Sequence, residues 1–137
     1  MRSGRLRNAA ALAVALAFAG CDDSPTTPAL FTTETFTGRV AQLASVSHNF
    51  VTGQASPVVI TIGGFTPNLT MGLALGNPTV TTAGETCLIT VGQAAVAPGD
   101  TFQVQLERGT YCVMIFDIGG ITDPASTVSY SVTVQHR

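Results

Sequence analysis

Apolar and polar residues alternate along much of the chain after residue 30, and this spacing predicts β-strands. In the segment 127–135, for example, single Ser or Thr residues separate the apolar residues. No run with the apolar spacing of a helix reaches a helical length in this part of the chain. About eight strands are therefore expected. They span residues 35–41, 45–51, 58–62, 69–75, 85–91, 101–106, 111–118 and 127–135.

Residues that favour turns separate most of these segments. Gly, Pro, Asn and Asp suit turns because they adopt the required φ values or bond to nearby backbone groups. The expected turns are Gly53-Gln54, Gly63-Gly64, Thr66-Pro67-Asn68, Gly76-Asn77-Pro78, Ala97-Pro98-Gly99-Asp100, Arg108-Gly109 and Asp123-Pro124. Short strands separated by such turns predict an all-β fold, either a β-sandwich or a barrel.

The N-terminus has the pattern of a secretory signal peptide. Three arginines lie in residues 1–7, and the apolar run 9–19 follows them. This run is about half the length of a bilayer-spanning helix. The alternative is an Ala-rich helix of the folded domain, but Asp22-Asp23-Ser24-Pro25 would end such a helix at once.

The end of this segment, Phe18-Ala19-Gly20-Cys21, resembles the bacterial lipobox. In a lipobox, the signal peptidase cuts before a Cys whose thiol carries diacylglycerol, and several acyl chains make a nearly permanent anchor. The alternative is a soluble secreted protein in which Cys21 is not modified. The pattern predicts a lipoprotein signal peptide at 1–20, a lipidated Cys21 with a flexible tether at 21–34, and a β-sandwich domain at 35–137.

The charge of the chain excludes an electrostatic nucleic-acid binder. After residue 20, three arginines and no lysine stand against eight acidic residues, for a net charge of −5. Binding to nucleic acid depends on clustered cations that neutralise phosphates.

The cysteines are consistent with export. Once Cys21 is assigned to lipid, Cys87 and Cys112 remain as one pair in apolar, strand-like segments. We expect a disulfide between them, because disulfides persist outside the cytoplasm. Two buried free thiols are one alternative and a metal pair is another, although only His48 and His136 are available as further ligands.

Candidate chemistry is sparse. The motifs of serine hydrolases, zinc proteases and nucleotide-binding loops are absent from the sequence. Ser47 and His48 are adjacent, so on a strand they point to opposite faces, and both histidines are expected at the surface. We expect no enzymatic activity and no cofactor.

Two weaker ligand possibilities remain open. Glu85, Asp100, Asp117 and Asp123 lie near turns, where they are either solvated or contribute oxygens to a calcium ion. We expect no metal requirement, with the three aspartates as weak candidates. Tyr111 and Tyr130 either pack in the core or stack on sugars.

Four segments in order resemble the bacterial pre-peptidase C-terminal domain: 36–40 (FTGRV), 49–51 (NFV), 106–113 (LERGTYCV) and 129–134 (SYSVTV). The resemblance covers residues 35–135. It implies a single antiparallel, jelly-roll-like sandwich, and members of this family are mostly accessory domains of secreted enzymes. The acidic segment of the family has no counterpart in residues 68–75, so no calcium site follows from the resemblance.

Taken together, these patterns predict a non-catalytic, lipid-anchored β-sandwich module outside the cytoplasm. Its expected role is protein interaction or an accessory role in the cell envelope. The alternative is a glycan-binding module of the envelope.

Overall fold

The computed structural model of the protein describes residues 30–137. The predicted signal peptide, Cys21 and most of the predicted tether lie outside the described residues. Within these residues, no helix is long and apolar enough to cross a membrane.

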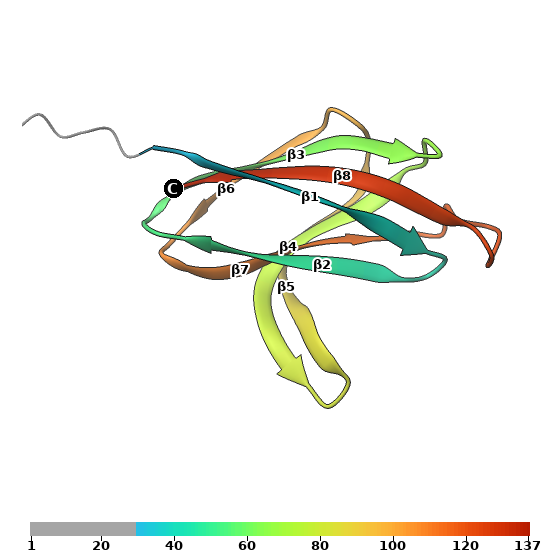
Figure 1. The fold of residues 1–137 in the computed structure, drawn as a ribbon, viewed down its shortest axis with the longest axis horizontal. Coiled ribbons are helices and arrows are strands. Elements are labelled where there is room, and N and C mark those ends of the chain that lie inside the picture. The colour runs from blue at the N-terminus through green and yellow to red at the C-terminus, as the bar shows by residue number, and fades with distance from the viewer. Residues whose placement is uncertain (1–29) are drawn as a thin grey trace, which may run out of the picture.

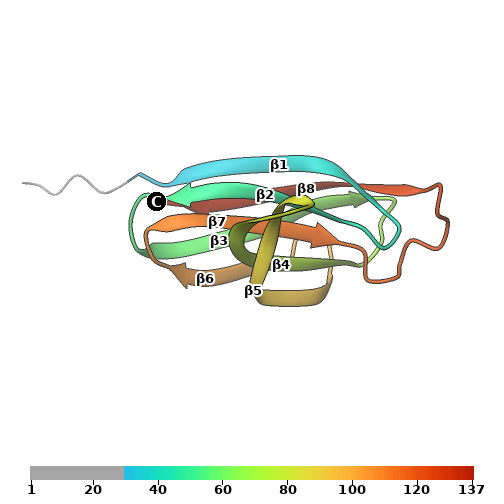
Figure 2. The ribbon, with the colours of Figure 1, turned by 90° about the horizontal axis from the view of Figure 1, so that it is seen from below.

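Eight antiparallel strands form two four-stranded sheets that pack face to face (Figures 1 and 2). The strands are β1 (Thr32–Ala41), β2 (Ser45–Thr52), β3 (Ser56–Thr66), β4 (Met71–Thr81), β5 (Gly84–Val96), β6 (Thr101–Leu106), β7 (Gly109–Phe116) and β8 (Thr127–His136). The β8 sheet has the order β1-β8-β3-β6, and the β7 sheet has the order β2-β7-β4-β5. Apart from the β4–β5 hairpin, every connection passes from one sheet to the other, as in a jelly roll. The predicted fold class is confirmed.

The core lies between the two sheets because apolar side chains alternate with polar ones along the strands. In β8, every second residue is buried, and most of the Ser and Thr residues between them are partly exposed. Ile60, Ile62, Met71, Leu75 and Ile115 are among the largest fully buried side chains. Each such side chain stabilises the fold by roughly 1.5–3 kcal/mol relative to an exposed one.

Two of the expected turns are wrong. Gly63-Gly64 lies within β3, where the register with β8 shifts between Ile62 and Gly64. Gly76-Asn77-Pro78 lies within β4, which continues to Thr81 and pairs with β5 along its whole length. Glycine and proline within a strand therefore mark a bulge and an extended hairpin here.

Gly76 is required by a close approach of two backbones. A Cβ at this position would lie 1.9 Å from the carbonyl oxygen of Leu88 in β5. Pro78 is tolerated because it pairs with Cys87 beyond the point where β4 leaves β7, so its missing N–H removes no bond to β7.

This close approach predicts that Gly76→Ala destabilises the fold by about 2 kcal/mol or more, since backbone must move to admit the methyl group. Gly92→Ala is the matched control on β5, where an added Cβ would be no closer than 3.7 Å to any neighbouring atom. Urea unfolding of both variants measures the difference. Equal loss in the two variants would contradict the interpretation.

Candidate functional site

Asp117 does not lie in a solvated turn, which corrects one of the two expectations for this residue. It is buried, and its carboxylate accepts hydrogen bonds from four backbone N–H groups. Three of these come from Gly119, Gly120 and Ile121, and the fourth comes from Leu43 in the β1–β2 turn at 2.9 Å. The carboxylate therefore ties together two turns that are far apart in the sequence.

These bonds change the acidity of the group. The N–H of Leu43, and then those of Ile121, Gly119 and Gly120, lower the pKa of Asp117 because they stabilise the charged carboxylate. Burial acts in the opposite direction but is outweighed. The carboxylate of Asp117 thus completes the backbone hydrogen bonding of the turns, a role that needs no metal ion.

The other acidic candidates are also engaged locally. Asp100 accepts the N–H of Ala97 at 2.8 Å, and Asp123 accepts the N–H of Ala125 at 2.9 Å. Among the described residues, no three His, Cys, Asp or Glu side chains gather as a metal site would require. The structure thus places the carboxylates of Asp100 and Asp123 each within its own turn.

The histidines differ from the expectation of surface positions. His136 is buried, and its Nε2 lies 2.7 Å from Oε1 of Glu34. His48 is half-buried between the sheets, where it stacks on Phe36 and bonds the hydroxyl of Tyr130 at 2.6 Å. Burial lowers the pKa of His48. In the described part of the chain, no acidic side chain hydrogen-bonds to His48 or to Tyr130.

Neither tyrosine forms a sugar-stacking surface. Tyr130 is buried against Gly38, and the Tyr111 hydroxyl donates to the carbonyl oxygen of Glu107 at 3.2 Å. Phe31 is the large aromatic side chain that stands exposed in residues 30–137. An exposed strip of aromatic residues is therefore absent from this part of the molecule.

The hollow between β5 and β6 also lacks a catalytic set. It has a volume of about 150 Å³. Asp100 is its one charged lining residue, and the carboxylate of Asp100 already accepts the N–H of Ala97. The hollow therefore lacks the second titratable group that general acid–base catalysis by two side chains would need.

The feature that stands out from the sandwich is the β4–β5 hairpin. β4 pairs with β7 only over residues 72–76, and beyond Gly76 it has β5 alone beside it. Residues 77–89 therefore form a two-stranded arm, which Figure 1 shows projecting from the body.

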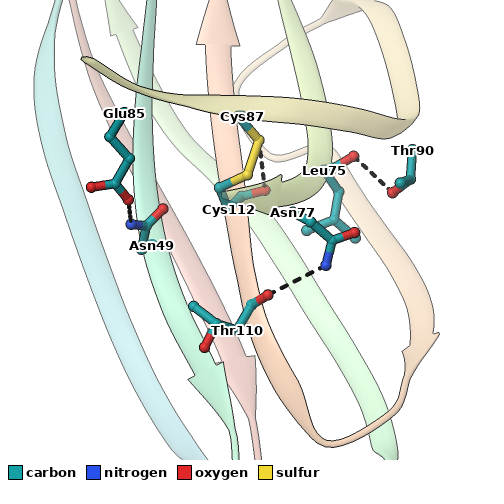
Figure 3. Close-up of a disulfide and its surroundings, with 8 residues drawn as sticks. All are labelled: Asn49, Leu75, Asn77, Glu85, Cys87, Thr90, Thr110 and Cys112. Carbon is teal, nitrogen blue, oxygen red and sulfur yellow. Dashed lines mark hydrogen bonds between the residues drawn. A yellow bond between two sulfur atoms is a disulfide. The ribbon is translucent and has the colours of Figure 1, made fainter. Parts of the chain in front are cut away.

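The arm is fixed at its base by a covalent bond. Cys87 and Cys112 form the expected disulfide, with a Cα–Cα distance of 5.9 Å, and it links the arm to β7 (Figure 3). The neighbouring Val113 belongs to the core, so Cys112 points to the outer face of the β7 sheet. Cys112 is nonetheless fully buried, because the arm covers it.

Two side-chain hydrogen bonds support the same contact. The amide nitrogen of Asn49 in β2 donates to the carboxylate of Glu85, and that of Asn77 donates to the carbonyl oxygen of Thr110 at 3.4 Å (Figure 3). A two-stranded ribbon is at best marginally stable in water by itself. The disulfide and these bonds therefore hold the arm in one orientation.

The arm presents apolar side chains to solvent. Val80 is 83% exposed, Leu88 61% and Ile89 49%, and Glu85 is the one acidic or basic side chain in residues 77–89. The register places Val80 on the same face of the arm as Cys87 and places Leu88 on the opposite face, so the arm exposes apolar side chains on both of its faces. Exposed apolar surface is a feature of interaction sites. Sequence reasoning missed the arm because Gly76-Asn77-Pro78 suggested a turn that would have ended β4 at residue 75.

No family model and no curated protein matches the chain. Solved structures with a similar fold include the following two. PliG of Aeromonas hydrophila, a periplasmic inhibitor of g-type lysozyme, has a TM-score of 0.53 and 14% identity over 74% of this chain and 83% of its own. The Yersinia pseudotuberculosis-derived mitogen has a TM-score of 0.52 and 12% identity over 79% of this chain and 88% of its own.

At these identities the likeness shows the fold alone. The chain is thus defined as a disulfide-bonded jelly-roll β-sandwich with a projecting arm. The resemblance to the pre-peptidase C-terminal domain stays a prediction, since no family model supports it.

The bonds of Asp117 predict a specific dependence of stability on pH. A carboxyl whose pKa is lower in the folded state stabilises the fold above the unfolded-state pKa of about 4, and this stabilisation is lost as the pH falls through the folded-state pKa. Asp117→Asn should therefore lower the free energy of unfolding by about 2 kcal/mol at pH 7. The difference from the wild type should shrink below pH 4.

Urea unfolding at several pH values measures this effect. Glu107→Gln serves as the control, because Glu107 is exposed and its carboxylate accepts none of these backbone bonds. A difference for Asp117→Asn that stays constant down to pH 2 would contradict the assignment.

Proposed function

We propose that this protein is a non-catalytic, lipid-anchored module outside the cytoplasm, and that it binds a protein partner through the arm. The observation that carries the proposal is the exposed apolar surface of a projecting hairpin whose base a disulfide fixes to β7. In the hairpin alone, Val80 and Leu88 remain in contact with water and contribute little to stability. A bound partner would remove their apolar surface from water, which favours binding.

Two independent features support the proposed location. The segment 1–21 has the pattern of a lipoprotein signal peptide, and the Cys87–Cys112 disulfide is of the kind that persists in oxidising compartments. The fold likeness to PliG adds a case in which this architecture acts in the periplasm by binding a protein. Together they support a role in protein contact within the cell envelope.

The non-catalytic part of the proposal rests on the arrangement of polar groups. Within residues 30–137, the aspartates complete turns and the two histidines pair with Tyr130 and Glu34. Because these side chains lie in separate places, they offer no convergent set for a reaction.

The lipid anchor is tested by fractionation of the full chain. Wild-type protein should be processed before Cys21, incorporate labelled palmitate and remain with the membranes. Cys21→Ala should abolish labelling and lipoprotein processing. Unlabelled, soluble mature protein from the wild-type gene would contradict the anchor and leave the arm unaffected.

The arm is tested by photo-crosslinking in the intact envelope. A benzophenone amino acid in place of Val80, which is 83% exposed, should form a protein adduct. The matched control is Leu43, which is 82% exposed in the β1–β2 turn and should form none. Adducts of equal yield at both positions, or none at Val80, would overturn the proposed role of the arm.

A further inference from the structure

The outer edge of β5 is an open strand edge. β5 stands at the end of the β7 sheet, and no strand of residues 30–137 lies on its other side. It has 13 residues, none of which is proline, and Glu85 is its single charged residue. Proteins ordinarily protect such edges with lysine, proline or short strands, so an unprotected edge is suited to pairing with another strand.

The one charge does not protect this edge. The carboxylate of Glu85 accepts a hydrogen bond from Asn49 of β2, which directs it toward the sandwich (Figure 3). The Glu85 carboxylate keeps its charge but is directed toward β2, while Leu88 and Ile89 are exposed farther along the same strand.

The pairing of β4 with β5 determines which backbone groups face outward. Pro78 has no N–H and lies opposite Cys87, so this is a pair without ladder hydrogen bonds. The neighbouring pair, Asn77 and Leu88, then exchanges the bonds of the β4–β5 ladder. Consequently, Cys87 and Ile89 direct their N–H and C=O groups to the open edge, while the groups of Leu88 point to β4.

The sequence of this edge is nearly symmetric about Leu88. Thr86 and Thr90 lie two residues on either side of it, and Gly84 and Gly92 lie four residues on either side. An antiparallel pair related by a two-fold axis at Leu88 places Thr86 opposite Thr90, and Leu88 opposite itself. Leu88 would then occupy a non-hydrogen-bonded pair, where opposing side chains are closest.

We propose that the partner of the arm is a second copy of this chain, which joins the β5 edge antiparallel about a two-fold axis at Leu88. This inference rests on the proposed function, because it names the protein that the arm contacts. Cys87 and Ile89 supply the outward backbone bonds, and the two Leu88 side chains meet across the axis. The register shift that leaves Thr90 unpaired with β4 bends β5 after Ile89 and keeps this ladder short.

The symmetry of the contact provides its test. Two differently tagged copies of the full chain are co-expressed, and one tag is used to purify them from solubilised membranes. Leu88→Glu in both copies, or Leu88→Arg in both, places like charges opposite each other and should reduce co-purification at least tenfold. Leu88→Glu in one copy with Leu88→Arg in the other should restore it to at least half of the wild-type level.

The same charges at Val51 form the matched control. Val51 is 60% exposed on β2, against 61% for Leu88, so the substitutions alter exposed surface equally. They should leave co-purification unchanged. Thermal melting of every variant should match the wild type, which shows that the fold is intact. The inference is overturned if the Leu88 variants with like charges still co-purify, or if the opposite-charge pair does not recover.

A benzophenone amino acid at Leu88 separates this inference from the proposed function. An adduct with twice the mass of the mature chain supports the second copy. An adduct of this chain with a different protein overturns the self-pairing and leaves the protein-binding role standing. The absence of any adduct at both Leu88 and Val80 overturns both.

Discussion

The covalent bond between Cys87 and Cys112 determines where the arm lies relative to the sandwich. β4 has lost β7 as a neighbour beyond Gly76, so the backbone ladder alone would leave residues 77–89 as an isolated ribbon. The bond closes a loop with a sequence separation of 25. In the chain-entropy model, such a loop contributes about 3.5 kcal/mol by restricting the unfolded chain. That amount is a large share of the stability of a typical domain.

A second contact fixes two loops relative to each other, the β1–β2 turn and the segment that follows β7. The Asp117 carboxylate joins the β1–β2 turn to the segment that follows β7, and it bonds Leu43, which has a φ of 55°. A left-handed leucine costs roughly 1–2 kcal/mol. The charge-assisted bond at its N–H offsets this cost, since such bonds are about twice as strong as neutral ones. The Asp117 carboxylate therefore adds an electrostatic contact between the two turns to the apolar packing of Ile121.

Most of the fold was predictable because its strands have one face toward the core. β8 shows why: its alternation of apolar and polar residues is a direct record of inward and outward positions. β5 shows the limit of this reasoning. Almost all of its residues are exposed, so its sequence has no alternation of buried and exposed positions. In the neighbouring strand β4, Gly76 is required by a close approach of two backbones, but in the sequence it looks the same as a glycine required by a turn.

The candidate site was less predictable than the fold for a related reason. The pairing of Cys87 with Cys112 followed from counting cysteines, but the position of that bond on the outer face of a sheet did not. Asp117 looked like any acid near a glycine turn, because its partner Leu43 lies 74 residues away and contributes only a backbone N–H. Every residue except proline has a backbone N–H, so the residue type does not reveal which N–H groups bond a distant side chain.

The open edge of β5 and the predicted lipid anchor are physically linked. An unprotected edge on a freely diffusing protein invites pairing with many strands, at an affinity limited by the short ladder and the small apolar surface. Confinement of two chains to one membrane by the predicted anchor would raise their effective concentration and so the occupancy of the contact. Export also allows the disulfide to form, and without it the edge would have no fixed direction. The predicted signal segment, the cysteine pair and the edge with its single charge are therefore consistent with the proposed function, a membrane-anchored sandwich whose arm contacts a neighbouring protein.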